Sequence, residues 1–328
     1  MVYMDDLLKA VDTMEVAQKL ANELINLMKL GGFRLTKFMS NSKQFLESLP
    51  PSEISSKVTL DLSGETQRAL GVLWELATDR FKFTVNLPDA PETKRGILRV
   101  TCSIFDPLGF VLPFILTPKI LLRELWRLEV TWDEVVDDNS RNVWRVWKHN
   151  AASLSEVEVE RRFSHHDSPI VDIQLHIFAD ASELAYGTVA YLRFSYKDGV
   201  HKCAFVMAKS KLAPIKTISL AKLELSAAST AVRMYCNYIP HIDLPVESVY
   251  FWTDSTLVLQ YINNKTCRFK TFVANRVTEI VEKSDPAQWR HVPGTLNPAD
   301  VITRGVDNPK QLIESNTAGY AYIHGPES

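Results

Sequence analysis

The pattern of hydrophobic and polar positions changes several times along the first half of the chain. Apolar residues recur with the spacing of one helix face from Ala17 to Met28, and a glycine pair ends this pattern. Between residues 58 and 85, β-branched and aromatic residues alternate with polar ones, which predicts short strands joined by turns. From Glu92 to Asp138 the spacing is helical again, most clearly in KILLRELWRLEV. The first half therefore mixes helices with short strands.

The second half of the chain has a more regular pattern. Three strand-like runs come first: IVDIQLHIFADAS, AYGTVAYLRFSY and KCAFVMAKSKL. They are followed by a long helical run, ISLAKLELSAASTAVRMYCNYI, and then by the strand VESVYFWTDS, the helix STLVLQYINN and the strand QWRHVPG. A last helix starts in NPADVITRG, where Asn297 suits the N-cap and Pro298 the first helical position. This order predicts a mixed sheet of five strands flanked by helices.

Length and composition are those of a globular protein with more than one domain. The polar stretch FSHHDSP separates the two patterns, and we place a domain boundary between residues 164 and 170. The 328 residues suffice for two or three domains that each bury a core. A composition of 46% hydrophobic and 23% charged residues, with only 12 glycines, argues against a disordered or fibrous chain. The net charge of -2 does not by itself indicate a nucleic-acid-binding protein.

Cysteine spacing and apolar runs bear on the compartment. The 4 cysteines form no C-x-x-C pair, which argues against a zinc ribbon or a disulfide framework and favours reduced thiols. The N-terminus carries no basic-then-apolar leader. The most apolar run begins at Leu108 and is interrupted by Pro113, Pro118 and Lys119, so it predicts buried core rather than a membrane span. We therefore expect an intracellular, cytoplasmic protein without membrane contact.

Four carboxylates occupy informative positions in the second half. Asp180 ends the first strand of the predicted sheet, Glu224 lies in the long helix, Asp254 ends the fourth strand, and Asp300 lies in the first turn of the last helix. If the strands of Asp180 and Asp254 are parallel neighbours, both side chains lie at the edge where open α/β sheets form active sites. Glu224 falls on the helix face that should pack on the sheet. A carboxylate buried there is costly unless it is paired or binds a cation.

These acids together favour a site for divalent cations. Four converging carboxylates repel one another, and their hard oxygen ligands suit Mg²⁺ or Mn²⁺. Two such ions about 4 Å apart activate a water molecule and stabilise the leaving oxygen of a phosphoryl displacement. The residues therefore predict nuclease chemistry. Plainer interpretations stay open, because Asp254 and Asp300 also suit helix starts through the macrodipole, and a solvated helix position would explain Glu224.

The order Asp, Glu, Asp, Asp on this strand and helix pattern resembles ribonuclease H. FADAS, LEL, WTDS and NPAD are similar to its four metal-binding motifs. Longer strings extend the resemblance over roughly residues 3–306: LGVLW, SIFDPLGFVLP, KILLRELW, FKTFVANRV and WRHVPGTLNPAD. Together they resemble the Pol polyprotein of BEL/Pao-type LTR retrotransposons, from the end of the reverse-transcriptase palm through the thumb and connection into ribonuclease H.

The resemblance implies a division of the chain, a fold and a substrate. It implies a truncated palm end at residues 1–50, a thumb/connection-like region at 51–165, a ribonuclease H-like domain at 166–306 and a C-terminal tail at 307–328. The implied fold class is α/β, with a mixed five-stranded sheet flanked by helices in the third part. An RNA/DNA hybrid is the implied substrate, and two Mg²⁺ or Mn²⁺ ions are the implied cofactors, with no small-molecule cofactor. The rest of the Pol polyprotein is the implied protein partner.

The resemblance also implies roles for single residues. All four acids would be catalytic metal ligands, and His291 in RHVPG would assist proton transfer or product release. Taken alone, His291 would be an ordinary strand histidine. Ser182 and Ser255 directly follow the strand-end motifs and would contact the substrate backbone.

Basic residues near these motifs are candidates for phosphate contacts. Such groups can follow the phosphates of an RNA/DNA hybrid, and a solvated basic face explains them equally well. The candidates form two groups, Lys209, Lys211, Lys216 and Lys222, and then Lys265, Arg268, Lys270 and Arg276.

Two other functions have to be weighed against hybrid hydrolysis. The family region also carries the name Pao retrotransposon peptidase. Retroviral-type aspartic peptidases rely on Asp-Thr-Gly or Asp-Ser-Gly, however, and neither triplet occurs in the chain. The second alternative is a non-catalytic module that binds nucleic acid or protein. The presence of all four acids favours retained hydrolysis.

The first residues, MVYMDD, resemble a reverse-transcriptase catalytic motif. In that motif Asp5 and Asp6 lie in the turn of a hairpin, although the string alone also suits an acidic helix lead-in. Polymerisation needs a further metal-binding aspartate, the fingers and most of the palm, all of which would precede Met1. We therefore expect the polymerase motif to be incomplete and inactive.

Overall fold

Two compact units make up the protein. The computed structural model describes residues 2–3, 6–7, 9–11, 13–55, 66–69, 72–83, 86–266 and 268–312. Unit 1 comprises residues 1–84 with 158–162, and unit 2 comprises residues 85–157 with 163–328. The expected segment 51–165 is therefore divided, because its strands belong to unit 1 and its helices to unit 2. The four-part division of the chain stays a prediction.

Unit 1 contains two small sheets and two helices. A four-stranded sheet, antiparallel throughout, has the order β3 (Thr66–Ala69), β4 (Val72–Glu75), β5 (Arg80–Lys82) and β6 (Glu158–Glu160). The helices α1 (Met14–Leu30) and α2 (Lys43–Glu47) share a small core formed by Ala21, Phe45, Leu46 and Leu49. The helical and strand-like patterns predicted for this part of the chain agree with these elements.

The polymerase-like motif falls on the second sheet of unit 1. This sheet pairs β1 (Val2–Tyr3) with β2 (Asp6–Leu7) antiparallel, and Tyr3 is the partner of Asp6. Such pairing is that of a tight hairpin, in agreement with the motif. Asp5 lies outside the described residues, and the expected origin and inactivity of the motif stay predictions.

Three helices begin unit 2. They are α3 (Lys94–Cys102), α4 (Leu112–Arg127) and α5 (Asp138–Asn150). Trp144 and Trp147 of α5 are each 2% exposed, and their ring centroids lie 5.0 Å apart in a stacked arrangement. Trp147 also stacks on Phe114 of α4, and its Nε1 donates a hydrogen bond to the Phe114 carbonyl at 3.0 Å. These tryptophans therefore belong to the core of unit 2.

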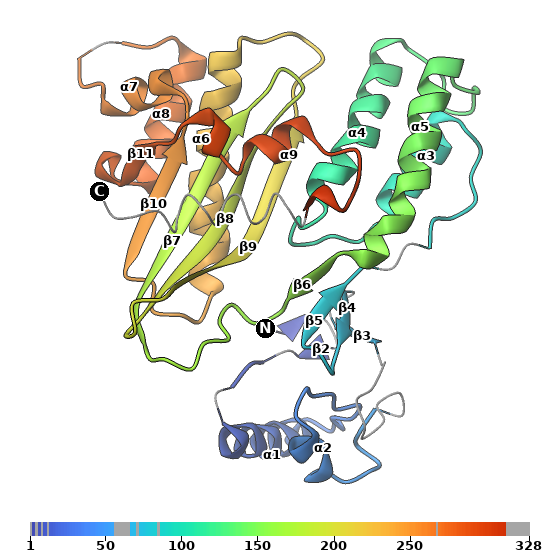
Figure 1. Ribbon diagram of the computed structural model, residues 1–328, viewed down its shortest axis with the longest axis vertical. Helices are drawn as coiled ribbons and strands as arrows, with labels where there is room; N and C mark the ends of the chain where they lie inside the picture. Colours follow the sequence, from blue (N-terminus) through green and yellow to red (C-terminus); the bar gives the residue numbers. More distant parts are fainter. Residues whose placement is uncertain are drawn as a thin grey trace. The chain divides into compact units, whose positions relative to one another are not determined.

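A mixed five-stranded sheet follows, as the sequence predicts (Figure 1). Its order is β11 (Trp289–His291), β10 (Ser248–Thr253), β7 (Ile170–Ala181), β8 (Ala185–Tyr196) and β9 (His201–Leu212). β10 runs parallel to both neighbours, whereas β8 is antiparallel to both of its own. The helices of this part are α6 (Leu220–Tyr238), α7 (Thr256–Asn263), α8 (Thr271–Lys283) and α9 (Asp300–Arg304). Of these, α8 was not predicted, although Val273, Val277 and Ile280 keep helical spacing.

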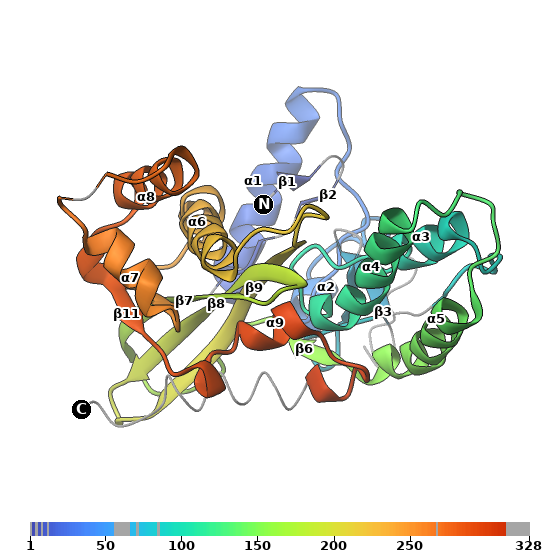
Figure 2. The same cartoon turned by 90° about the horizontal axis from the view of Figure 1, so that it is seen from above.

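The two faces of this sheet are covered by different helices. Figure 2 shows α6, α7 and α8 on one face and α9 on the other. The first face contributes Leu175 and Ile177 to the main core with α6, whereas Phe178 packs with Ile302 of α9 on the second. This division follows from the strand period of two, which turns successive side chains to opposite faces.

The apolar run that begins at Leu108 connects the helices α3, α4 and α5 to the sheet. The Leu108 carbonyl accepts a hydrogen bond from the Ala208 amide of β9 at 2.8 Å. Gly109 has a φ of +83°, and a Cβ there would lie 2.3 Å from the Ala208 oxygen, so only glycine fits. Leu112 packs beside Phe178 on the second face of the sheet. The run is buried core, and no helix of the described residues has the length and apolarity that a membrane crossing requires.

Candidate metal centre

Two neighbouring parallel strands bring two of the predicted acids together. β7 and β10 pair in parallel, with Ala179 opposite Thr253. Asp180 and Asp254 are the next residues along the chain, so both lie at the carboxyl edge of the sheet. Asp180 is 3% exposed and Asp254 is half-buried. The strand arrangement on which the sequence argument depended is therefore present.

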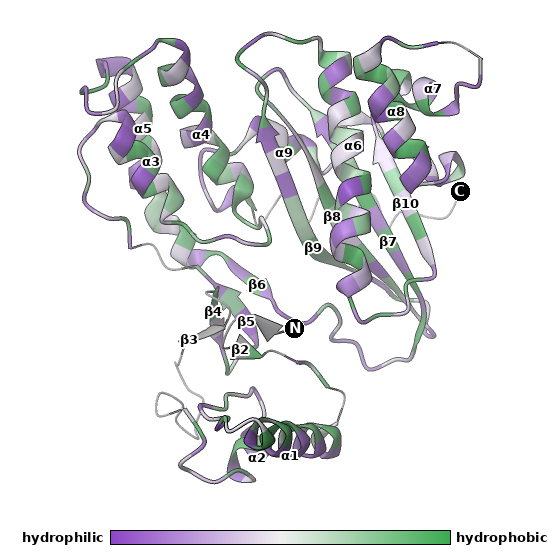
Figure 3. Cartoon of the chain, turned by 180° about the vertical axis from the view of Figure 1, so that it is seen from behind, coloured by the Kyte–Doolittle hydropathy of each residue, from purple (hydrophilic) through white to green (hydrophobic). Residues whose placement is uncertain are grey.

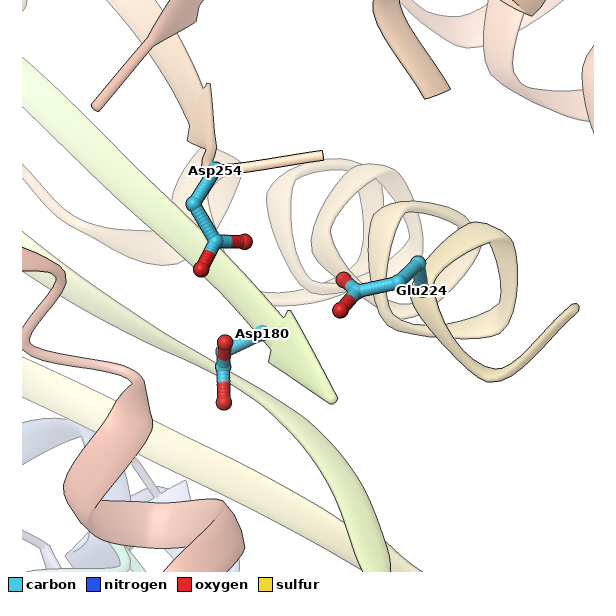
Figure 4. Close-up of side chains that lie close together, drawn as sticks. All are labelled: Asp180, Glu224 and Asp254. Carbon is cyan, nitrogen blue, oxygen red and sulfur yellow. The ribbon is translucent and has the colours of Figure 1, made fainter. Parts of the chain in front are cut away.

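Glu224 adds a third acid from the helix that covers this edge. It is 9% exposed and lies on the face of α6 that packs on the sheet. Ligand oxygens of Asp180, Glu224 and Asp254 all lie within 4.8 Å of one another. Figure 4 shows the three carboxylates pointing into a shared space between the strand ends and the helix. We call these three residues the acid cluster.

The negative charges of the acid cluster are not balanced by nearby cations or by a full set of hydrogen bonds among the described residues. Burial, followed by the charges of Asp180 and Asp254, raises the pKa of Glu224 to about 9. Burial also raises the pKa of Asp180 to about 6, against a hydrogen bond from Thr303, and raises the pKa of Asp254. Oε2 of Glu224 and Oδ1 of Asp254 are buried and have no hydrogen-bond partner among the described residues. Buried carboxylates of this kind are costly unless a cation joins them.

Asp300, the fourth predicted acid, lies beside the cluster without joining it. It is the first residue of α9, and its carboxylate forms an ion pair with Arg304 one turn later. Asp300 is nevertheless close enough to add to the effect of burial in raising the pKa of Asp180 and of Asp254. The pairing of Arg304 was not predicted, although its spacing of four residues from an acid is typical of such an ion pair.

His291 ends β11 at the same edge of the sheet. β11 runs parallel to β10 with His291 opposite Thr253, the residue before Asp254. The imidazole is exposed, and its charge lowers the pKa of Asp254 against the larger effect of burial. This position suits the predicted role of His291, which itself stays a prediction.

Asn297 ties the start of α9 to the end of β7. It is 4% exposed, its Nδ2 donates to the Ala179 carbonyl at 3.1 Å, and its Oδ1 accepts from the Ala299 amide at 3.1 Å. The expectation that Asn297 caps the helix is wrong, because α9 begins at Asp300 with Ala299 as its N-cap. Asn297 instead closes a turn before the helix and fixes the residue next to Asp180.

Two further residues touch the acid cluster and were not predicted. The hydroxyl of Thr303, a fully buried residue of α9, donates a hydrogen bond to Oδ2 of Asp180. Gly294 faces Asp254, and a Cβ at this position would lie 3.1 Å from Oδ2 of that residue. The sequence offered no periodic signal for either contact, because both depend on how the segment after β11 returns to the strand ends.

The two serines predicted to contact substrate both make structural hydrogen bonds. Ser182 Oγ donates to the Thr303 carbonyl at 2.8 Å and accepts from the Leu184 amide at 3.1 Å. Ser255 is the N-cap of α7 and accepts from the Val258 amide at 3.4 Å. These bonds account for the presence of a hydroxyl at each position. Contact with a substrate stays a prediction.

The predicted basic residues differ in how they are placed. The Arg276 guanidinium is half-buried, lies 3.5 Å from the ring centroid of Phe272 and donates through Nε to Ser226 at 3.1 Å, which indicates a packing role. The Lys209 ammonium lies 5.3 Å from the ring centroid of Tyr238. Five of the basic residues are exposed on β9 or on the loops that precede α6 and α8: Lys211, Lys216, Lys265, Arg268 and Lys270.

Comparison with known proteins finds a family model that matches just under half of the chain. Residues 93–255 match the family model described as Pao retrotransposon-like RNaseH-like domain. The matched segment contains the acid cluster and also includes α3, α4 and α5. No curated protein matches the chain.

Solved structures with similarity to the chain include ribonucleases H and a viral polymerase. RNase H1 from Halobacterium salinarum is 15% identical with a TM-score of 0.28, over 39% of this chain and 93% of that one. LC11-RNase H1, solved with an RNA/DNA hybrid, is 11% identical with a TM-score of 0.29, over 43% and 99%. A foamy viral protease-reverse transcriptase, solved with double-stranded DNA, is 13% identical with a TM-score of 0.41, over 87% of this chain and 44% of that one.

The fold and the family match together define the class of protein. The sheet order, the single strand β8 that runs antiparallel to the other four, and helices on both faces form an RNase H-like fold. The chain is a retrotransposon-type protein with an RNase H-like domain, which confirms the resemblance found in the sequence. Residues 93–255, just under half of the chain, are similar to the Pao retrotransposon-like RNaseH-like domain.

Proposed function

We propose that unit 2 hydrolyses the RNA strand of RNA/DNA hybrids by two-metal-ion catalysis. The acid cluster carries this proposal, since its three carboxylates converge within 4.8 Å and two of their buried oxygens have no partner among the described residues. Arg304, a cation whose charge reaches Asp180, is already paired with Asp300. A set of hard oxygen ligands in this state fits Mg²⁺ or Mn²⁺.

The chain supplies the ligands and controls their protons. Bound divalent cations supply the Lewis acidity that activates water and stabilises the leaving oxygen of a phosphoryl displacement. Asp180, Glu224 and Asp254 would hold the ions, after Asp180 and Glu224 release the protons that their raised pKa values favour. Asp300 would become the fourth ligand if Arg304, whose side chain is 70% exposed, turns away. The exposed His291 would assist proton transfer or product release.

Surface charge supports a nucleic-acid substrate for the same edge. Lys211 is exposed near the end of β9. The last residue of β9 lies at the same edge of the sheet as Asp180. Lys265, Arg268 and Lys270 form an exposed basic loop between α7 and α8. Contacts of these side chains with phosphates would make binding weaken as salt rises.

A cleavage assay with purified full chain tests the proposal. A labelled RNA/DNA hybrid should be cleaved in its RNA strand with Mg²⁺ and left intact with a chelator. Asp180→Asn should lower the rate by more than about 100-fold, because loss of a ligand should cost at least as much as loss of an outer partner of a metal site. Asp133→Asn is the matched control, since Asp133 makes an exposed ion pair with Arg95 of α3.

Each other outcome has a meaning. Folded protein that binds the hybrid without metal-dependent cleavage would contradict hydrolysis and favour the non-catalytic binding module. Cleavage of a peptide substrate by the same sample, lost in Asp180→Asn, would favour the peptidase.

A further inference from the structure

An open groove lies between α4 and the end of β9. Its volume is about 330 Å³. One wall is a single face of α4, formed at helical spacing by Lys119, Leu122, Arg123 and Trp126, and the other is the segment Leu212–Ile215. Figure 3 shows α4 beside β9, and Figures 1 and 2 show the same neighbours. We call this feature the α4 groove.

Trp126 presents a fixed aromatic ring to the α4 groove. The residue is 50% exposed, although exposed tryptophans are unusual. The Lys94 ammonium lies 4.1 Å from its ring centroid, and Trp132 packs edge-on against it at 5.3 Å. Lys94 is itself 3% exposed and donates to the Val130 carbonyl. The ring is therefore held in place while part of it stays in solvent, so binding a flat partner would cost little side-chain entropy.

The charges around the α4 groove favour an anionic occupant. Arg123 donates to the Pro214 carbonyl at 3.2 Å, and its buried Nε has no hydrogen-bond partner among the described residues. Lys119 lines the same wall, and Lys216 is exposed just beyond the groove. Two acids lie near these cations. Glu124 lies 3.8 Å from Arg123 and pairs more closely with Arg127 at 2.7 Å. Burial of its carboxyl group raises the pKa of Asp106, and the charge of Lys119 acts in the opposite direction.

The α4 groove opens at the same edge of the sheet as the acid cluster. Leu212 of β9 lies opposite Ala185 of β8, and Tyr186 of β8 lies opposite Ala181 of β7, the residue after Asp180. The groove wall is thus two strands away from Asp180, about 10 Å at the usual strand spacing. A nucleic-acid strand that passes the acid cluster would reach the groove within a few nucleotides.

We infer that the α4 groove binds an unpaired nucleotide of a strand that continues beyond the hybrid. Its base stacks on Trp126, and its phosphate lies near Lys119 and Arg123. A fixed aromatic ring next to cations is the arrangement by which proteins bind single strands without sequence preference. This inference rests on the proposed function for its choice of ligand, and it narrows the substrate class to hybrids with a single-stranded extension.

Binding measurements on the full chain test this inference. The Asp180→Asn variant is used so that the hybrid is not cleaved during the measurement. Fluorescence anisotropy then compares the affinity for a blunt hybrid with that for the same hybrid carrying an overhang of about six nucleotides. The overhang should tighten binding. Trp126→Ala should remove that gain, with a loss of about 5- to 100-fold for the overhang hybrid and none for the blunt one.

Control variants separate stacking from a folding defect. Trp126→Phe keeps an aromatic ring beside Lys94 and should lose less affinity than Trp126→Ala. Leu128→Ala changes a residue that is 56% exposed near the end of the same helix and should have no effect. An overhang of abasic nucleotides should bind like the blunt hybrid.

Three results would overturn the inference. They are equal binding of blunt and overhang hybrids by the parent protein, an equal gain from the abasic overhang, and equal losses for both hybrids in Trp126→Ala. The first of these results, together with binding of an amphipathic peptide in the groove, would favour a protein occupant. Because binding is read in the absence of cleavage, failure of the proposed hydrolysis would be seen separately in the cleavage assay.

Discussion

Two glutamates at helix α6 have opposite surroundings: Glu224 belongs to this helix, and Glu279 of α8 packs against it. Glu224, near the start of α6, lies among acids and has a buried oxygen without a partner among the described residues. Two turns later, Ser229 and Arg233 bind Glu279 of α8 at 2.6 Å each, and Lys283 binds it at 2.7 Å. The pKa of Glu224 is raised to about 9, chiefly by burial, whereas that of Glu279 is lowered to about 2, chiefly by Arg233.

This difference distinguishes Glu279, which stabilises the fold, from Glu224, which is a candidate functional residue. Glu279 has its charge compensated by partners within the fold, so it links α6 to α8. Glu224 receives no such compensation, although the same helix provides it to a neighbour. Groups that are costly to bury and remain uncompensated are typical of functional sites. The contrast is therefore the physical reason for locating the function at the start of α6.

The largest effect should come from exchanging each acid for its amide. Glu224→Gln should lower metal-dependent cleavage by more than about 100-fold. It should also raise the melting temperature of the metal-free protein, because it removes a buried carboxyl group that has to take up a proton when the chain folds at neutral pH. Glu279→Gln should leave cleavage unchanged. It should lower the free energy of unfolding by about 1–2 kcal/mol, allowing for the half-exposed Arg233.

Cleavage kinetics and chemical denaturation, each with and without Mg²⁺, measure these effects. Circular dichroism of both variants controls for folding. If Glu224→Gln cleaved normally, or if Glu279→Gln lost activity while still folded, the distinction between the two sites would not hold.

A smaller effect should appear in the pH dependence of stability. Glu224 loses its proton near pH 4.5 when unfolded and near pH 9 in the folded, metal-free protein. The folded state therefore binds more protons in this window, and its stability should fall as the pH rises. Mg²⁺ should reverse this fall, because it binds the ionised carboxylates. Glu279, whose folded pKa is about 2, contributes in the opposite sense: its stabilisation is present above pH 4.5 and is lost toward pH 2.

Thermal melts across that pH window, with and without Mg²⁺, give this dependence. The matched variant is Glu224→Gln, in which the fall with rising pH should become shallower. A metal-free stability that rises steadily through the window in the parent protein would contradict the burial of an uncompensated acid.

The smallest effect should come from Gly294→Ala. The added methyl group would lie 3.1 Å from Oδ2 of Asp254, so the carboxylate has to move by a few tenths of an ångström. We expect Mg²⁺ affinity to fall by a few-fold, less than the roughly 10- to 100-fold that loss of an outer partner costs. Titration calorimetry measures the affinity. Gly199→Ala, in a turn where a Cβ meets nothing within 4 Å but φ is +83°, controls for general strain. An unchanged Mg²⁺ affinity in Gly294→Ala would show that the residue at position 294 does not restrict the position of the Asp254 carboxylate.

The order of elements in unit 2 could be predicted because its strands and helices have regular periods. The convergence of Asp180 with Glu224 could be predicted for the same reason, because one lies at a strand end and the other on a packed helix face. Their role as metal ligands stays a prediction. The ion pair of Asp300 with Arg304, the tie made by Asn297 and the contact of Gly294 were not predicted. These features depend on the path of the segment after β11, where short turns replace regular periods. Helix α8 was missed because its apolar face is narrow.

The seat of α4 on β9 determines which part of this chain can be exchanged as one piece. Gly109 lies against Ala208, and Leu112 covers Phe178, so a segment that starts at residue 166 would carry an apolar surface without its cover. Exchange of chain segments at residue 166 would separate two parts of one hydrophobic core. The smallest segment that keeps the acid cluster on a sheet with this cover therefore begins before Leu108.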